Sequence, residues 1–143
     1  FVGVSVFYLF TDNVLSTTAV KGPSMAPTLS PKSRSAGIHD RVLLWRGLPR
    51  QNLKRGDVVT FWKPHNPEEI SIKRIIALEG DTNYIGGSGM YDGAVKCPDG
   101  SVKIVVPHNH IWVEGDNWTA SQDSNDFGPI SKAMVDGKAL YIM

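Results

Sequence analysis

Residues 70–78, Ile-Ser-Ile-Lys-Arg-Ile-Ile-Ala-Leu, place apolar side chains at both alternating positions of the run. This pattern, rich in β-branched residues, is typical of a strand that is buried on both faces. Similar short runs lie on either side of it, separated by turns that draw on the chain's 14 glycines and 9 prolines. No segment keeps a helical period for more than about two turns. The sequence therefore predicts a mainly β fold, with further strands at residues 42–45, 57–62, 102–106, 110–114 and 138–143.

The segments between these strands read as turns and loops. We expect one short helical turn at residues 131–136, stopped by Gly137. Residues 30–37 and 86–100 are rich in glycine, serine and polar side chains, and we expect them to form exposed loops.

Size and charge limit the classes of function. The chain has 143 residues, 41% hydrophobic and 20% charged, which suits one compact domain. Fifteen Lys and Arg against 14 Asp and Glu leave a net charge of +1, so we expect no nucleic-acid partner. Cys97 is the only cysteine, which excludes an internal disulfide and a cysteine-rich zinc site.

The first ten residues, Phe1 to Phe10, are apolar apart from Gly3 and Ser5. Ten residues are fewer than the ~20 that a membrane-spanning helix needs, so a core strand or a cleaved signal segment is an alternative. Phe, Tyr and Leu side chains beside the polar residues 11–13 are typical of a helix end at a bilayer interface. We expect residues 1–12 to be the end of an N-terminal transmembrane anchor and residues 13–143 to form the folded domain.

Several common catalytic motifs are absent from the sequence: HExxH, the P-loop, GxGxxG after a strand, and the GxSxG elbow. His108 and His110 are two residues apart, which is more typical of surface imidazoles than of a metal site. Asn117-Trp118-Thr119 matches the N-glycosylation pattern, which has meaning only for a chain in the secretory pathway. None of these features assigns a function.

Ser24 has an unusual setting, because Pro23 and Pro27 bracket it closely. Pro23 directs Gly22 toward extended geometry, and Pro27 prevents a helix through the segment. We therefore expect the hydroxyl to lie on a stiff, extended support, where a nucleophile needs little further ordering before it attacks. The alternative is an ordinary serine in a proline-rich turn, and the local sequence alone favours that alternative.

A serine hydroxyl needs a nearby base to become a useful nucleophile. Lys73 lies in the middle of the apolar run 70–78, and burial there would lower its pKa from the ordinary value of about 10.4. The alternative is that Lys73 extends its ammonium into water from a sheet edge, and Lys103 lies in a similar apolar run and is a rival for the role of base. Spacing alone does not separate these two lysines.

Four blocks of the chain resemble, in order and spacing, the motifs of the type I signal peptidases. They are residues 22–29 (GPSMAPTL), 55–59 (RGDVV), 73–81 (KRIIALEGD) and 115–124 (GDNWTASQDS). Residues 73–81 and 121–131 are most similar to the peptidases of the mitochondrial inner membrane; bacterial members usually carry Arg where this chain has Asn125. The resemblance implies an antiparallel β-sheet catalytic domain and a serine endopeptidase with a Ser-Lys dyad.

The resemblance also implies roles for individual residues. Ser24 would be the nucleophile, Lys73 the general base, and Ser121 the residue that orients the lysine by a hydrogen bond. The Ser24 main-chain N–H would donate to the oxyanion, and the second donor of many bacterial relatives is missing because Gly22 occupies its position. Asp123 would pair with Arg74 as part of the scaffold.

Substrate contacts follow from the same resemblance. An apolar, shallow pocket for the small residue before the cleaved bond would be lined by Val20, Met25, Leu29 and Ile72. The substrate would lie extended and add as a strand beside the segments around Met25 and Ser71.

The implied partners are precursor polypeptides with sorting signals, a sister catalytic subunit and the inner membrane, with the catalytic domain in the intermembrane space. No metal or organic cofactor is expected. The alternatives are a bacterial signal peptidase, the endoplasmic reticulum signal peptidase, which has His at the position of Lys73, and a self-cleaving Ser-Lys repressor. A non-catalytic peptide-binding subunit is the alternative from a different class.

Overall fold

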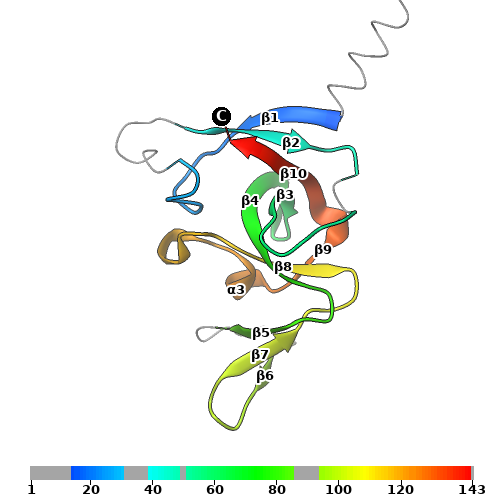
Figure 1. Ribbon diagram of the computed structural model, residues 1–143. Helices are drawn as coiled ribbons and strands as arrows, with labels where there is room; N and C mark the ends of the chain where they lie inside the picture. The colour runs from blue at the N-terminus through cyan, green and yellow to red at the C-terminus, as the bar shows by residue number, and fades with distance from the viewer. Residues whose placement is uncertain (1–13, 31–38, 49–50, 86–93, 143) are drawn as a thin grey trace, which may run out of the picture.

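The computed structural model describes residues 14–30, 39–48, 51–85 and 94–142 (Figure 1). Seven strands form one antiparallel sheet in the order β1-β2-β10-β3-β4-β8-β9. These strands are β1 (Leu15–Ala19), β2 (Arg41–Trp45), β10 (Val135–Ile142), β3 (Val58–Lys63), β4 (Asn66–Leu78), β8 (His110–Glu114) and β9 (Ile130–Ser131). The mainly antiparallel β fold expected from the sequence is confirmed.

The 13-residue strand β4 is central to this sheet. It pairs with β3 on one side, where Val59 lies opposite Lys73, and with β8 on the other, where Arg74 lies opposite Glu114. The C-terminal strand β10 inserts between β2 and β3. Main-chain pairing with β3 therefore fixes residues 70–74 of β4, and pairing with β8 fixes residues 74–78.

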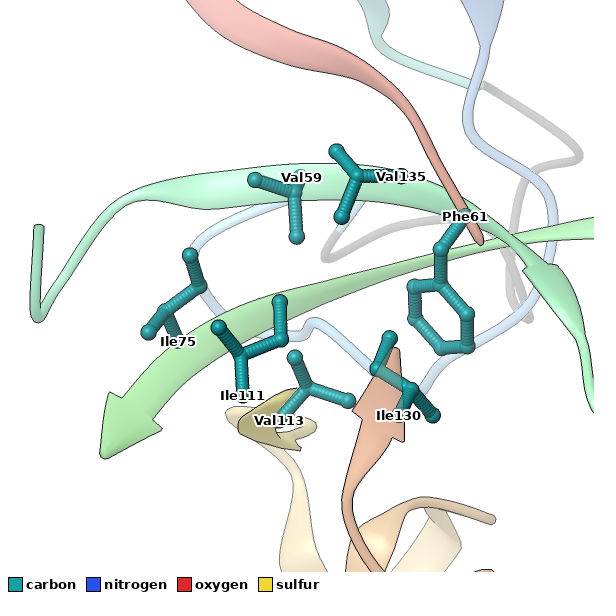
Figure 2. Close-up of a cluster of buried hydrophobic side chains, with 7 residues drawn as sticks. All are labelled: Val59, Phe61, Ile75, Ile111, Val113, Ile130 and Val135. Carbon is teal, nitrogen blue, oxygen red and sulfur yellow. The ribbon is translucent and has the colours of Figure 1, made fainter. Parts of the chain in front are cut away.

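A hydrophobic cluster drawn from five strands packs beside β4. Figure 2 shows its side chains directed toward one another, and each is at most 2% exposed. The cluster comprises Val59, Phe61, Ile75, Ile111, Val113, Ile130 and Val135. Burial of each such side chain contributes on the order of 1.5–3 kcal/mol to folding, so this cluster holds β4 in place.

A smaller antiparallel sheet lies at the end of the molecule opposite β1 and β2 (Figure 1). Its strands, in the order β5-β7-β6, are β5 (Thr82–Ile85), β7 (Val102–Val105) and β6 (Val95–Lys96). Its buried residues Ile85 and Ile104 belong to a cluster with Trp112 of β8. The described residues also form three short helical turns: η1 (Trp118–Ala120), α3 (Ser124–Phe127) and η2 (Lys132–Met134).

The predicted strands are present, but two sequence-based expectations need correction. The helical turn expected at residues 131–136 is limited to η2, and Gly137 lies inside β10 rather than ending a helix. The expected loop at residues 86–100 contains the short strand β6. Strand β1 was not predicted, because its sequence Leu-Ser-Thr-Thr-Ala has few hydrophobic residues. Residues 31–38 and 86–93, within the two expected loops, lie outside the described residues.

The expected N-terminal anchor, residues 1–12, also lies outside the described residues. Within the described ranges, no helix is long and apolar enough to cross a bilayer.

Candidate active site

Strand β4 places Lys73 inside the molecule. Successive residues of a strand point to opposite faces, so Lys73 shares a face with the fully buried Ile75. The Lys73 side chain is only 4% exposed. A lysine in this position is held by the sheet and has little access to water.

Ser24 lies in the segment from Val20 to Ser30, which connects β1 toward β2. The base of this segment is closed by Asp40: its main-chain oxygen accepts from the Val20 N–H (2.9 Å) and its carboxylate accepts from the Ser30 N–H (2.7 Å). The buried Ser30 hydroxyl donates to the Val20 carbonyl at 3.0 Å. Met25, 0% exposed, anchors the middle of the segment in the hydrophobic cluster beneath it.

The support of Ser24 is a turn rather than the extended segment expected from the sequence. Gly22 has φ +89°, a left-handed conformation that a side chain rarely adopts, so the expectation that Pro23 makes it extended is wrong. The Ala26 N–H donates to the Pro23 carbonyl and the Leu29 N–H to the Met25 carbonyl. Pro27 stops these turns from becoming a regular helix.

The structure brings Ser24 and Lys73 together. The Lys73 ammonium donates a hydrogen bond of 2.8 Å to the Ser24 Oγ, across 49 residues of sequence. Of the two lysines that the sequence left as alternatives, Lys103 lies instead on β7 of the small sheet. A hydroxyl and an amine at this distance can exchange a proton directly.

The environment of Lys73 favours its uncharged form. Its pKa is lowered from 10.5 to about 8, chiefly because burial removes water from the ammonium. The positive charge of Lys63 lowers the pKa further, whereas the negative charge of Asp123 opposes the shift. With a pKa of about 8, roughly a tenth of the molecules carry a neutral Lys73 at pH 7.

Ser121 lies at the site but makes a different contact from the one expected. Its hydroxyl donates to the Asp123 carboxylate at 2.6 Å, and among the described residues no hydrogen bond joins it to Lys73. A Cβ atom added to Gly115 would lie 2.2 Å from the Ser121 Oγ and 2.6 Å from the Ser24 carbonyl. Gly115 therefore allows Ser121 and the Ser24 main chain to approach the same point.

The expected ion pair between Arg74 and Asp123 is wrong. Arg74 instead forms two hydrogen bonds with Asp116, at 2.8 and 2.7 Å, and donates to the Gly56 carbonyl at 2.8 Å. The Arg74 guanidinium hydrogen-bonded to Asp116 lowers the pKa of that carboxyl. Geometry explains the partner, because Arg74 points to the strand face opposite Lys73.

Asp123 has neutral partners. It accepts from the Gly115 N–H and the Ser121 hydroxyl on one oxygen, and from the Asn125 main-chain and side-chain N–H groups, at 3.1 and 3.0 Å, on the other. Asn125 thus supplies an amide donor, while α3 begins with Asp123 as its N-cap. Among the described residues, no cation forms a salt bridge with this buried carboxylate.

A cleft of about 550 Å³ opens beside the dyad. Both Ser24 and Lys73 line it, together with Val20, Ser71 and Ile72 of the predicted substrate contacts. Met25 and Leu29 depart from the expectation: both are buried in the cluster beneath the segment, and Leu29 lines a separate cavity of about 440 Å³. The residues of β1 form one wall of the cleft, and β1 is the edge strand of the sheet.

This cleft suits an extended polypeptide. An edge strand offers unpaired main-chain groups to which a further strand can add. In the described part of the chain no group of three or more His, Cys, Asp or Glu side chains could hold a metal ion.

Comparison with known proteins places the chain in a family. The family described as signal peptidase, peptidase S26, matches residues 1–91 and 88–143. The chain belongs to this family. It is therefore a peptide hydrolase of the signal peptidase type, and the resemblance deduced from the four motif blocks is confirmed.

Individual members of the family are similar to this chain over most of its length. Mitochondrial inner membrane protease subunit 2 of Saccharomyces cerevisiae is 40% identical over 98% of this chain and 74% of the relative. The protein of the same name from Mus musculus is 39% identical over 100% of this chain and 75% of the relative. A signal peptidase I from Enterococcus faecalis V583 aligns with 64% of this chain and 98% of its own, at 23% identity and a TM-score of 0.48.

Two residues in the motif 115–124 had no role in the sequence analysis. Asp116 is the partner of Arg74, and Asn117 contacts the main chain on either side of Ser24. The sequence could have indicated both residues as part of the site, because they lie in the same motif as Ser121 and Asp123.

Proposed function

We propose that this chain is a membrane-bound serine endopeptidase that removes sorting presequences from proteins delivered to the mitochondrial intermembrane space, using Ser24 and Lys73 as a dyad. The observation that carries the proposal is the 2.8 Å contact between the Ser24 Oγ and the Lys73 Nζ beside an open cleft. The names of the relatives support the inner membrane as the location and a protease of more than one subunit, and we propose a sister catalytic subunit as the partner.

The proposed reaction starts with neutral Lys73. It takes the proton of the Ser24 hydroxyl as the oxygen attacks the scissile carbonyl, and it returns that proton to the departing amine. A water molecule then attacks the acyl-enzyme and gives a proton to Lys73, which passes it to the Ser24 oxygen as the ester bond breaks and the acid product leaves. The depressed pKa of about 8 matters because an ammonium with the ordinary value of 10.5 would be almost completely protonated at neutral pH.

Main-chain groups stabilise the charge that develops on the substrate. The Ser24 N–H has no hydrogen-bond acceptor among the described residues and is the proposed donor to the oxyanion. Because Gly22 has no side-chain donor, the second hydrogen bond to the oxyanion comes from a main-chain amide or a water molecule.

The substrate binds as an extended strand between β1 and the part of β4 that contains Ser71. Main-chain hydrogen bonds to the edge provide affinity. Val20 and Ile72 line the cleft beside the dyad, so they would contact the small residue before the cleaved bond. Asp123 and Ser121 stabilise the wall behind Lys73 through their mutual hydrogen bond.

The test is cleavage of an imported precursor by the membrane-anchored protein, with and without its partner subunit, followed by mapping of the cut bond. We expect Ser24→Ala to abolish the cut. The matched control is Ser101→Ala, an exchange in a turn of the small sheet where Ser101 contacts Asp99. Wild-type cleavage by the Ser24→Ala enzyme would instead assign the chain a non-catalytic, peptide-binding role.

A further inference from the structure

Asn117 makes two hydrogen bonds to the turn that carries the nucleophile. Its main-chain N–H donates to the Ser24 carbonyl at 2.9 Å, and its side-chain Nδ2 donates to the Pro23 carbonyl at 3.1 Å. Its Oδ1 accepts from the Thr119 hydroxyl at 2.8 Å. The tripeptide 117–119, which matched a glycosylation pattern in the sequence, therefore has its amide engaged inside the protein.

Asn117 supplies a donor to each of the two peptide groups that flank Ser24, and the Pro23 carbonyl also accepts from the Ala26 N–H at 3.1 Å. The Pro23 carbonyl belongs to the same planar peptide as the Ser24 N–H, and the two groups point in opposite directions. A donor that fixes the Pro23 carbonyl therefore also aims the Ser24 N–H. The second bond, to the Ser24 carbonyl, fixes the peptide on the other side. Together they determine the direction in which Cα of Ser24 projects its hydroxyl.

This control is needed because Ser24 lies outside any strand. Its segment is made of turns and begins at Gly22 with a positive φ, so no ladder of main-chain bonds fixes it. The bond from Asn117 to Pro23 spans 94 residues of sequence. The neighbouring Asp116 is bound to Arg74, which directly follows Lys73 on β4. Residues 116–117 thus connect the strand that carries the base to the turn that carries the nucleophile.

Thr119 sets the direction of the amide. An amide side chain has one donor end and one acceptor end that are similar in shape. Because the Thr119 hydroxyl donates to Oδ1, the NH₂ end faces Pro23. Trp118 lies between these two residues in the sequence, and its 85% exposed side chain is directed to solvent.

We propose that Asn117, oriented by Thr119, is a positioning residue that aims the Ser24 N–H at the oxyanion and holds the Ser24 hydroxyl at bonding distance from Lys73. The inference rests on the proposed function, since it assigns Ser24 as the nucleophile. Asn117 is not among the described residues that line the cleft, so its effect is on the reaction step rather than on substrate binding.

The experiment measures precursor cleavage by Asn117→Asp, Thr119→Val and Thr119→Ser in the membrane-anchored protein with its partner subunit. Asn117→Asp keeps the shape but replaces the donor to Pro23 by a carboxylate oxygen. We expect kcat to fall about 10- to 100-fold with KM within about twofold, because the lost bond acts on transition-state geometry. Thr119→Val should lower kcat about 3- to 10-fold, and Thr119→Ser, which keeps the hydroxyl, should restore it.

Two controls separate this role from others. The rate constants are measured on the high-pH plateau, where a change in the pKa of Lys73 no longer affects the rate. Asn52→Asp adds the same charge at an exposed position outside the cleft lining and should leave kcat unchanged.

Outcomes of the experiment are distinct. A folded Asn117→Asp enzyme with wild-type kcat, or one with only KM altered, would overturn the inference. If Asn117→Asp does not fold, a Thr119→Val enzyme as fast as Thr119→Ser would overturn it. Cleavage by Ser24→Ala at the wild-type rate would overturn the proposed function itself, which the Asn117 and Thr119 variants leave untouched.

Discussion

The two members of the dyad are held by opposite means. Lys73 lies on the 13-residue strand β4, where it is paired with Val59 of β3 and is followed by the residues that pair with β8, beside a buried cluster. Ser24 lies in a turn without strand pairing, and side chains or single main-chain bonds from distant residues hold it. The comparison teaches that burial in the sheet tunes the chemistry of the base, whereas a few separate contacts determine the position of the nucleophile.

The largest effect should come from removing the base. Lys73→Met keeps the length and apolar stem of the side chain but removes the amine, so we expect the sheet to remain folded and kcat to fall at least about 10³-fold. Lys73→Arg should be as inactive, because a guanidinium stays protonated and cannot accept the serine proton. Precursor cleavage measures the loss, and circular dichroism checks the fold.

A Lys73→Arg enzyme with more than about a tenth of the wild-type rate would contradict this prediction. The control is Lys103→Met, which removes a lysine from the small sheet and should leave kcat unchanged, because Lys103 lies on β7 away from the dyad.

A smaller effect should come from loosening the base of the segment from Val20 to Ser30, the nucleophile segment, which carries Ser24. Ser30 is only 1% exposed. Its hydroxyl donates to the Val20 carbonyl and accepts from the Asp40 N–H. Ser30→Ala leaves both buried groups without this partner, so we expect the free energy of unfolding to fall by about 1–3 kcal/mol. Urea denaturation measures the change.

The half-buried Ser101 provides the matched control for this substitution. Its hydroxyl bonds only to the nearby Asp99 among the described residues, so Ser101→Ala should change the free energy of unfolding by less than about 0.5 kcal/mol. Equal losses for the two variants would show that the base of the nucleophile segment is not specially dependent on Ser30.

The same contrast explains how much the sequence could predict. The strand that carries Lys73 could be predicted because a run of apolar, β-branched residues is a local signal. The motif blocks also identified Ser24, but the turn that supports it was expected to be extended. That error arose because Gly22 adopts φ +89°, a freedom that the rule for residues before proline does not anticipate.

Long-range partners were the least predictable part of the site. Arg74 was expected to bind Asp123, and it binds Asp116 instead. Both carboxylates lie in the same motif, and only the three-dimensional register of β4 against residues 115–124 decides between them. Met25 and Leu29 were expected in the substrate pocket, yet any apolar side chain in a turn can face the core as readily as a cleft.

The smallest predicted effect is the pH dependence of cleavage, which sharpens the comparison because it reports on the base alone. With a pKa of about 8, the neutral fraction of Lys73 rises as pH rises, so kcat/KM should increase about tenfold from pH 7 to pH 9 and then level off. Lys63→Met removes a positive charge that lowers this pKa, so its midpoint should move upward. Ser30→Ala should leave the midpoint unchanged, because it loosens the turn and not the sheet. A wild-type midpoint near 10.5 would mean that burial in β4 does not tune Lys73.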